Sequence, residues 1–258
     1  MLLRDKVVVV SGIGPGLGRS IALQCASAGA DLVLAARTES RLTEVAKEVT
    51  ELGRRAVVVP TDINDEAAVA NLVETARDAF GRVDTVVNNA FAIPPIADLV
   101  DVDLEQVRAG FETNVLAALR LTRSFVPALA ESEGSVVMIN SAVLRHSRLT
   151  FGPYKMAKSS LLALAQSLAT ELGPRGIRVN TVAPGYIWAG NLKWYFNYLA
   201  EQRGITAEEV YAETASTIDL RRLPEPDEIA EAVVFFASSM ARAITGACLD
   251  VNCGEYHH

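Results

Sequence analysis

Tyr154 and Lys158 lie four residues apart in the segment 154–171, whose apolar residues recur at helical spacing. That spacing places the phenol and the ammonium on one face of a helix. A free phenol has a pKa of about 10, and a nearby ammonium favours its ionised form. We therefore expect Tyr154 to exchange a proton with a substrate oxygen. A Tyr-x-x-x-Lys pair alone is common and is more often a surface pair, so this hypothesis depends on the other motifs.

Two polar residues from other segments belong with this pair. Ser141 follows the apolar run Val136–Ile139, and the carboxyl ends of parallel strands line the ligand crevice of an α/β sheet. A hydroxyl there can hydrogen-bond a substrate oxygen and its developing charge. Asn114 lies in an otherwise apolar helical pattern, where a buried amide needs partners. It could anchor a water that relays protons from Lys158.

A glycine-rich segment, Ser11–Gly18, follows the β-branched run Val7–Val10 and leads into an amphipathic helical pattern, Leu17–Ala28. Glycines allow a sharp turn and the close approach of a pyrophosphate to the free N–H groups at a helix start. The Gly-x-x-x-Gly-x-Gly spacing from Gly12 to Gly18 differs from the Gly-x-Gly-x-x-Gly of other dinucleotide folds. The strand before it and the helix after it disfavour a plain structural turn. With the tyrosine and lysine, this loop predicts a hydride-transfer enzyme.

The residue after the second predicted strand, Asp31–Ala36, bears on the choice of nucleotide. An acid at the strand end would bind the adenosine ribose 2′-OH, which Ala36 cannot do. Arg37 instead offers a forked cation suited to a 2′-phosphate. We therefore expect NADP(H) to be preferred, with NAD(H) also accepted. The alternative is a solvated arginine that opens the helix Thr38–Leu52.

The chain has 258 residues and is 50% apolar, enough to bury a sizeable core as one domain, 1–258. Strand-like and helix-like segments alternate, which predicts an α/β fold, a doubly wound parallel sheet with helices on both faces. The strand-like segments are Val7–Val10, Leu32–Ala35, Ala56–Val59, Thr85–Val87, Val136–Asn140, Arg178–Val182 and Leu249–Val251.

Composition argues against several classes of protein. The net charge is −7 and no basic stripe exists, so nucleic acid is not an expected partner. No apolar run approaches the ~18 residues of a membrane span, and the first residues do not resemble a signal peptide. Three cysteines without metal spacing indicate reduced thiols in a cytoplasmic protein and no metal site.

These residues together resemble the short-chain dehydrogenase/reductase family over essentially the whole chain. The matching elements are Gly12, Gly16, Gly18, Asp62, Asn88-Asn89-Ala90, Asn114, Ser141, Tyr154, Lys158 and Pro184-Gly185. The resemblance implies a Rossmann fold, an Asn114–Ser141–Tyr154–Lys158 catalytic tetrad, a small carbonyl or alcohol substrate and a homotetramer or homodimer. It also implies that Asp62 meets the adenine amino group and that Lys158 holds the nicotinamide ribose.

The loop, Arg37 and the resemblance together give a set of expected cofactor contacts. They are Gly12, Gly14, Gly16, Leu17, Gly18, Arg37, Asp62, Ile63, Asn89, Ala90, Tyr154, Lys158, Pro184, Gly185 and Ile187. Three positions depart from the family pattern. Phe91 replaces the usual glycine after Asn-Asn-Ala, Ala189 replaces a threonine that often holds the carboxamide, and Cys253 interrupts a Val-Asp-Gly-Gly motif.

Substrate specificity is expected in residues 143–151 and 186–223. Six of the chain's sixteen aromatics lie between residues 186 and 198, which suggests a lid, 186–223, over an apolar substrate. The alternative is that these rings pack the lid against the body or a neighbouring subunit. The expected substrate contacts are Phe91, Val143, Phe151, Tyr186, Trp188 and Trp194. Arg145, His146 and Arg148 could meet an anionic group or could be solvated loop charges.

We therefore predict an oxidoreductase that interconverts an alcohol and a ketone or aldehyde, with NADPH-dependent reduction of an apolar carbonyl as its direction. A β-ketoacyl thioester reductase, a hydroxysteroid-type dehydrogenase and an epimerase on the same residues stay open. A non-catalytic nucleotide-binding protein is a further alternative, which the intact tetrad disfavours.

Overall fold

The parallel sheet expected from the alternating segments is present in a computed structural model of the chain, which describes residues 1–93, 95 and 97–257. Over those residues, seven strands pair side by side and all in parallel, in the order β3-β2-β1-β4-β5-β6-β7. The strands are β1 (Val7–Ser11), β2 (Asp31–Ala36), β3 (Ala56–Pro60), β4 (Thr85–Asn88), β5 (Ser135–Ile139), β6 (Arg178–Pro184) and β7 (Cys248–Val251). Each predicted strand is confirmed, and the α/β fold class with it.

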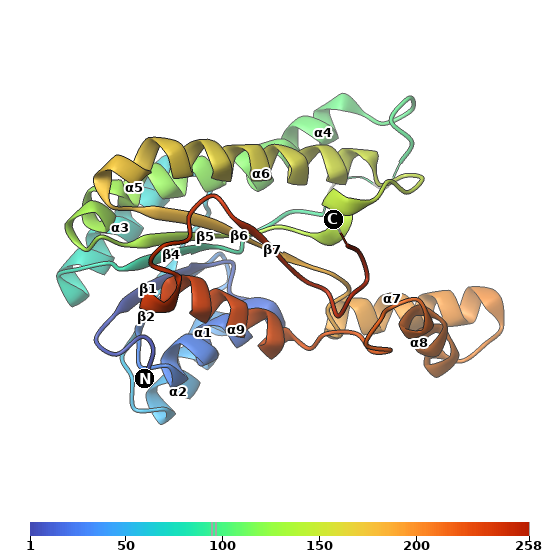
Figure 1. Ribbon diagram of the computed structural model, residues 1–258, viewed down its shortest axis with the longest axis horizontal. Helices are drawn as coiled ribbons and strands as arrows, with labels where there is room; N and C mark the ends of the chain where they lie inside the picture. Colours follow the sequence, from blue (N-terminus) through green and yellow to red (C-terminus); the bar gives the residue numbers. More distant parts are fainter. Residues whose placement is uncertain (94, 96, 258) are drawn as a thin grey trace.

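Helices cover both faces of this sheet (Figure 1). The α-helices are α1 (Leu17–Ser27), α2 (Glu39–Glu51), α3 (Glu66–Phe80), α4 (Leu104–Phe111), α5 (Ala117–Glu131), α6 (Gly152–Leu172), α7 (Gly190–Arg203), α8 (Ala207–Ser216) and α9 (Pro226–Ala237). Single turns of other helix types occur at η1 (Glu112–Leu116), η2 (Ala142–Arg145), η3 (Gly173–Arg175) and η4 (Ser239–Ala241). Helices α1, α2 and α9 lie on one face, and α3, α5 and α6 lie on the other.

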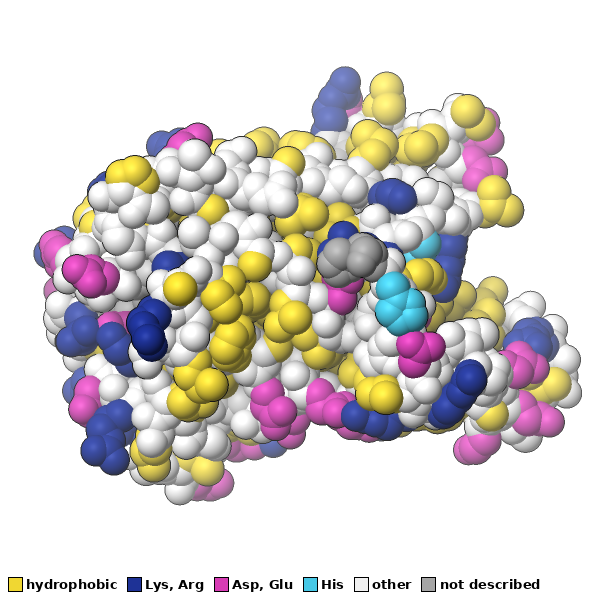
Figure 2. Space-filling model, viewed as in Figure 1, with side chains coloured by type: hydrophobic (Ala, Val, Ile, Leu, Met, Phe, Trp, Pro, Cys, Tyr) yellow, Lys and Arg dark blue, Asp and Glu magenta, His cyan; other side chains and the backbone are white. Residues whose placement is uncertain are grey.

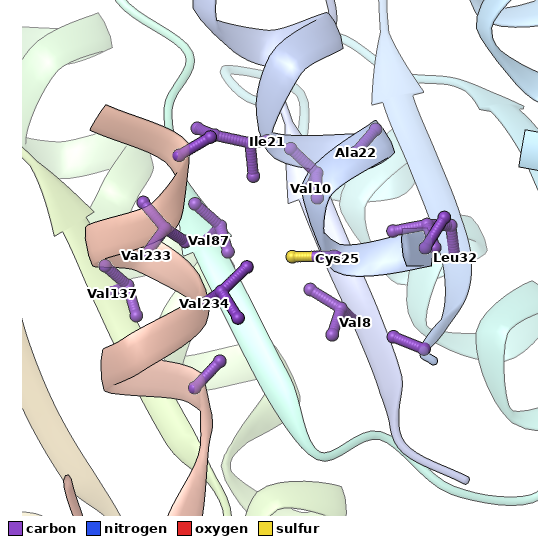
Figure 3. Packing of buried hydrophobic residues seen from close by; sticks show 14 of the residues in the cluster. Val8, Val10, Ile21, Ala22, Cys25, Leu32, Val87, Val137, Val233 and Val234 are labelled. Carbon is purple, nitrogen blue, oxygen red and sulfur yellow. The ribbon is translucent and has the colours of Figure 1, made fainter. Parts of the chain in front are cut away.

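The strands are apolar throughout because both faces are buried. Along β1, Val8 and Val10 pack into the layer under α1 and α9, while Val7 and Val9 pack into the opposite layer. In the first layer the Cys25 side chain of α1 points in among the strand valines (Figure 3). Its complete burial raises the pKa of the thiol to about 12, so it behaves as a small apolar side chain.

A third apolar cluster belongs to residues 186–223, the segment that the sequence suggested as a lid. Phe196 and Ala200 of α7 pack with Val210 of α8 and Ile218, apart from the two layers of the sheet. Figure 1 shows α7 and α8 at one end of the molecule, beyond the carboxyl edge of the sheet. The lid segment therefore has a small core of its own.

Contacts between charged side chains join segments at the amino edge of the sheet. The buried Asp84 carboxylate accepts hydrogen bonds from Lys6, Arg82 and the Val7 backbone N–H, each with one contact at 2.9 Å. Burial acts to raise the pKa of Asp84, but these hydrogen bonds hold it below its usual value. Over the described residues, no helix is both long and apolar enough to cross a bilayer.

Candidate active site

The glycine loop between β1 and α1 is compact because two of its glycines touch neighbouring backbone. Gly12 has φ of +80°, and a Cβ there would lie 2.5 Å from the Ala90 backbone. A Cβ on Gly18 would collide with the Gly12 carbonyl, which accepts a hydrogen bond from the Asn89 side chain at 2.8 Å. Only glycine fits at these two positions. The loop after β1 is thereby joined to the end of β4.

The outer glycines of the loop face open space instead. A Cβ on Gly14 would meet nothing within 4 Å, and one on Gly16 would lie 3.6 Å from the Ala189 side chain. The first turn of α1 carries no acidic side chain, so its free N–H groups and positive dipole end stay available to an anion. The residues present therefore fit a pyrophosphate. Leu17 and Ile187 are partly buried and pack against the apolar cluster that contains Ile13 of this loop.

Ser11 is a residue of this loop that the sequence did not single out. Its hydroxyl donates to the Val87 carbonyl at 3.1 Å and accepts from the backbone N–H of Asn89 at 3.3 Å. The side chain is 1% exposed and fixes the ends of β1 and β4 against each other. A serine before a glycine turn is too common to signal this role.

The nucleotide-binding candidates occupy the carboxyl edge of the outer strands. Arg37 directly follows β2 and is exposed, with no side-chain partner among the described residues. Asp62 follows β3 and accepts a hydrogen bond from the Asn64 backbone N–H at 2.9 Å. The Ile63 side chain is nearly buried, and its carbonyl accepts from Arg120 at 3.2 Å. These side chains stand at the edge where the sequence predicted them.

Helix α6 begins at Gly152, two residues before the predicted start, and carries Tyr154 and Lys158 inward. Lys158 is 3% exposed, and its ammonium donates to the Ile139 carbonyl at 3.0 Å. The Lys158 nitrogen lies 5.9 Å from the centre of the Tyr154 ring. Tyr154 in turn contacts the Ser141 hydroxyl. The structure thus brings three members of the expected tetrad together.

The ionisation of the tyrosine differs from the sequence expectation. Burial raises the pKa of Tyr154, and the contact with the Ser141 hydroxyl lowers it by less. Burial also lowers the pKa of Lys158 to about 8, because the ammonium has lost its water shell. The direction of the Tyr154 pKa shift is opposite to the one that the sequence argument expected from the ammonium, and it favours the protonated phenol.

Asn114 stands in a π-helical turn, η1, that interrupts the run from α4 to α5 where the sequence predicted regular helix. Its amide nitrogen donates to the carbonyls of Ala92 (2.9 Å) and Gly110 (2.8 Å). Its Oδ1 atom is buried without a hydrogen-bond partner in the described chain. Single π-turns often occur at functional sites, and this one leaves an acceptor ready for a water or hydroxyl.

Asn140 is a second residue that the sequence reasoning missed. Its Oδ1 accepts from the Ser141 N–H at 2.9 Å, and its amide nitrogen donates to the Lys158 carbonyl at 3.0 Å. One buried amide therefore ties Ser141 to the helix of Tyr154 and Lys158. The sequence placed Asn140 at the end of a strand, but it did not indicate the hydrogen bond to Lys158, 18 residues away.

The substrate candidates divide into buried and exposed groups. Val143 is 2% exposed and belongs to the core, and Trp188 packs on Phe196 and Tyr211 within the lid. Phe91 is half exposed, with its ring centre 5.9 Å from the Lys158 nitrogen, so this departure from the family pattern brings a ring to the site. Trp194 is exposed and stacks on Tyr198 of the same helix.

The basic residues after Ser141 are partnered by acids or tyrosines. Arg145 forms an ion pair with the largely buried Asp250 at 3.0 Å. Arg148 lies 3.7 Å from the Glu255 carboxylate and donates to the hydroxyls of Tyr186 and Tyr256. Burial, then the charges of Arg148 and Lys155, lower the pKa of His146. Both arginines therefore already have an acidic partner within the chain.

The described residues contain no cluster of three or more histidine, cysteine or acidic side chains arranged to hold a metal ion. The site at the carboxyl edge therefore consists of a phosphate cradle, a buried phenol, an ammonium and two polar side chains.

Comparison with known proteins extends this description over nearly the whole chain. A family model described as enoyl-(acyl carrier protein) reductase matches residues 12–256. An uncharacterized oxidoreductase of Mycobacterium tuberculosis is 37% identical, and the match covers 98% of this chain and 92% of that protein. The L-rhamnose 1-dehydrogenase (NAD(P)(+)) of Azotobacter vinelandii is 35% identical over 99% of this chain and 98% of its own.

The fold is also shared with an enzyme whose structure has been solved. A 7α-hydroxysteroid dehydrogenase, crystallised with NADH and 7-oxo glycochenodeoxycholic acid, superposes with a TM-score of 0.89 and 29% identity. That match covers 98% of this chain and 94% of the other. The family model, the relatives and the shared fold agree on one family. The chain belongs to the short-chain dehydrogenase/reductase family of NAD(P)-dependent oxidoreductases.

Proposed function

We propose that this enzyme reduces an uncharged, largely apolar ketone with NADPH, with Tyr154 as the proton donor. The observation that carries the proposal is the contact of the Tyr154 phenol with the Ser141 hydroxyl, beside the buried Lys158 ammonium. A protonated phenol is the form that reduction requires, because the carbonyl oxygen must gain a proton.

Each residue of the tetrad has a distinct part in this reaction. Ser141 holds the carbonyl oxygen by a hydrogen bond, and Tyr154 gives that oxygen its proton. Lys158 holds the ribose hydroxyls and returns a proton toward Tyr154. The unpartnered Oδ1 of Asn114 accepts a hydrogen bond from a water in that proton path. The bound nicotinamide supplies the hydride.

The cofactor proposal rests on the loop and on Arg37. The open sides of Gly14 and Gly16 and the free first turn of α1 support binding of a pyrophosphate. The exposed, unpaired Arg37 beside the Ala36 strand end supports a 2′-phosphate partner and hence NADPH.

The substrate proposal rests on charge and on the lid. Arg145 and Arg148 already have acidic partners, which disfavours an anionic substrate group near them. The exposed Trp194 and Tyr198 offer an apolar surface on α7. We propose that residues 186–223 form a mobile lid on a single domain and that these two rings cover the substrate.

Two other substrates within the family have specific support. The family description favours an acyl thioester, and the 7-oxo bile acid bound to the related steroid enzyme favours a fused-ring ketone. A non-catalytic nucleotide-binding protein would not need a buried phenol and a buried ammonium together.

We also propose a homotetramer or homodimer in the cytoplasm, with the three thiols reduced. Leu104 of α4, Leu116 of η1 and Met156 of α6 are exposed on elements that pack against one another, which supports a subunit contact there. Mass photometry of the purified protein and fractionation of cells that contain it test these two points.

A direct assay tests the reaction. Purified enzyme with NADPH or NADH is offered cyclohexanone, 1-decalone, a 7-oxo steroid, acetoacetyl thioester and levulinate, and loss of the reduced cofactor is followed. We expect NADPH-dependent reduction of 1-decalone or the steroid, and little of levulinate. Levulinate as the fastest substrate would contradict an uncharged substrate, and NADH as the better cofactor would contradict the use of Arg37.

A further inference from the structure

The C-terminal strap, residues 252–257, connects three segments that surround the candidate active site. Its backbone carbonyls at Cys253 and Gly254 accept hydrogen bonds from Leu220 (3.0 Å) and Asp219 (3.4 Å), at the end of the lid segment. Figure 1 shows this part of the chain passing between the lid helices α7 and α8 and the loop that follows β5. The strap therefore lies where the lid and the body meet.

Glu255 attaches the strap to the loop that follows β6. Its side chain is 8% exposed, and Oε2 accepts a hydrogen bond from the Tyr186 backbone N–H at 3.3 Å. A Cβ on Gly185 would lie 2.5 Å from the same oxygen, so the carboxylate packs directly on the Gly185 backbone. The carboxylate is thus seated on the two residues that follow Pro184 at the carboxyl end of β6.

Arg148 attaches the same strap to the loop that follows β5. One terminal nitrogen lies 3.7 Å from Glu255 Oε1 and donates to the Tyr256 hydroxyl at 2.7 Å, and the other donates to the Tyr186 hydroxyl. The guanidinium also lies over the Tyr186 ring, 5.4 Å from its centre. The rings of His146 and Tyr256 pack at 4.7 Å. The two loops on either side of the site meet through these strap residues.

The two charged side chains of this connection differ in burial. Glu255 is buried, whereas Arg148 is about two-fifths exposed. Burial raises the pKa of Glu255, and the Tyr186 N–H and the Arg148 charge oppose that rise. Loss of Arg148 would leave a buried carboxylate without a counter-charge, whereas loss of the carboxylate would leave an arginine that water can solvate. The pair therefore depends on Arg148 more than on Glu255.

We propose that Glu255 is a positioning residue, which through Tyr186 and Arg148 fixes the loop after β6 at its distance from the loop after β5. This inference rests on the proposed reductase function, since that loop borders the site of Tyr154. Arg148 serves the strap rather than a substrate anion.

The test compares Glu255→Gln, Arg148→Met and the double variant Arg148→Met/Glu255→Gln. Hydrogen–deuterium exchange reports on the Tyr186 amide without any substrate, and NADPH affinity, kcat and KM are measured with 1-decalone. The control is an exposed ion pair outside the lid, Arg108 and Glu105 of α4, altered as Arg108→Met and Glu105→Gln.

We expect Arg148→Met to speed exchange at Tyr186 at least about tenfold and to lower kcat several-fold, with NADPH affinity within about twofold of wild type. Glu255→Gln should have a smaller effect, because the amide oxygen still accepts from Tyr186. The double variant should return toward the Glu255→Gln values, since no buried charge remains. The control variants should change none of these quantities.

Two results would overturn the proposal. Exchange at Tyr186 that stays at the wild-type rate in both Arg148→Met and Glu255→Gln would show that Glu255 and Arg148 do not hold this loop. Levulinate is assayed as a second substrate, and a KM that rises in Arg148→Met for levulinate but not for 1-decalone, with no rescue by Glu255→Gln, would assign Arg148 to anion recognition instead. Failure of the reductase proposal itself is read separately, as unchanged turnover in Tyr154→Phe, and leaves the exchange result standing.

Discussion

The side-chain amide of Asn140 donates a hydrogen bond to the backbone carbonyl of Lys158 at 3.0 Å. The same side chain accepts from the N–H of Ser141, so the end of β5 and the middle of α6 share one buried group. The distance between the hydroxyl of Ser141 and the phenol of Tyr154 therefore depends on a residue that is itself only 4% exposed.

Asn140→Ala should lower kcat at least about tenfold and destabilise the fold by about 1–3 kcal/mol, the cost of buried groups left unpaired. Asn180→Ala is the matched control, because Asn180 is equally buried and bonds Ile244 and Ala247 away from the site. Thermal melts should show similar losses for both variants, and only Asn140→Ala should lose turnover. Equal losses of turnover would contradict a specific role.

Tyr154→Phe should lower turnover by at least about a hundredfold, the scale of a lost general acid. The ring stays, so the melting temperature and NADPH affinity should remain close to wild type. Steady-state kinetics and fluorescence titration with NADPH measure the two effects. Turnover near the wild-type value would remove Tyr154 from the chemistry.

Lys158→Met should stabilise the cofactor-free protein and abolish its activity. The pKa of Lys158 is lowered by burial from 10.5 to about 8, so the native state carries a desolvated charge below that pH. Below pH 8 Lys158 is protonated in both the native and the unfolded chain, so the native state bears the full free-energy cost of the buried ammonium. Between about pH 8 and 10.5 only the unfolded chain binds the proton, so wild-type stability rises with pH. The gain at pH 7 should be at most about 3.5 kcal/mol, because the pKa falls from 10.5 to about 8 and each pKa unit is worth about 1.4 kcal/mol.

Urea unfolding of wild type and Lys158→Met at pH 7 and pH 10 measures this difference. The advantage of the variant should shrink at the higher pH, where wild-type Lys158 is neutral. A variant less stable than wild type at pH 7 would mean that the ammonium is not a net cost to the fold.

Arg37→Ala should weaken NADPH binding selectively, by about 1.5–3 kcal/mol for a charged hydrogen-bond partner. NADH affinity should hardly change. Arg41→Ala is the control, an exposed arginine one helical turn further along α2. Dissociation constants for both reduced cofactors decide the matter, and equal weakening of both would contradict recognition of the 2′-phosphate by Arg37.

Trp194→Ala should raise the KM for 1-decalone more than for cyclohexanone, because a larger substrate loses more contact with the exposed ring of α7. NADPH affinity and the oligomer should be unaffected. The sequence alone suggested the same outcome for Phe196→Ala, but Phe196 is 2% exposed and packs in the lid's own core. That variant should instead destabilise the lid. Dissociation of the oligomer by Trp194→Ala, with selectivity unaltered, would place this ring at a subunit contact.

The sequence was most informative where structure is local or repetitive. The strands were recognisable because each is a continuous apolar run, and the glycine loop because its spacing and flanks form a single motif. The candidate tetrad was found by type and spacing, and three of its members do lie together. Fold class and family follow from such signals alone.

What the sequence could not show depends on contacts between distant segments. The π-turn at Asn114 arises where helices meet, and nothing in its residues departs from a regular helical pattern. The roles of Ser11, Asn140 and the strap depend on partners from 18 to over 100 residues away. The rise in the pKa of Tyr154 comes from its burial, and the spacing of residues in the sequence does not reveal how deeply a side chain is buried.

The ionic contacts at Asp84 lie at the end of the sheet opposite to the chemistry. Asp84, Lys6 and Arg82 hold the amino edge, while the glycine loop, Tyr154 and the strap occupy the carboxyl edge. A substitution among the side chains of the carboxyl edge therefore leaves these ionic contacts in place. In evolution, residues at the carboxyl edge can therefore change and alter the substrate, while selection for folding preserves the contacts at the amino edge.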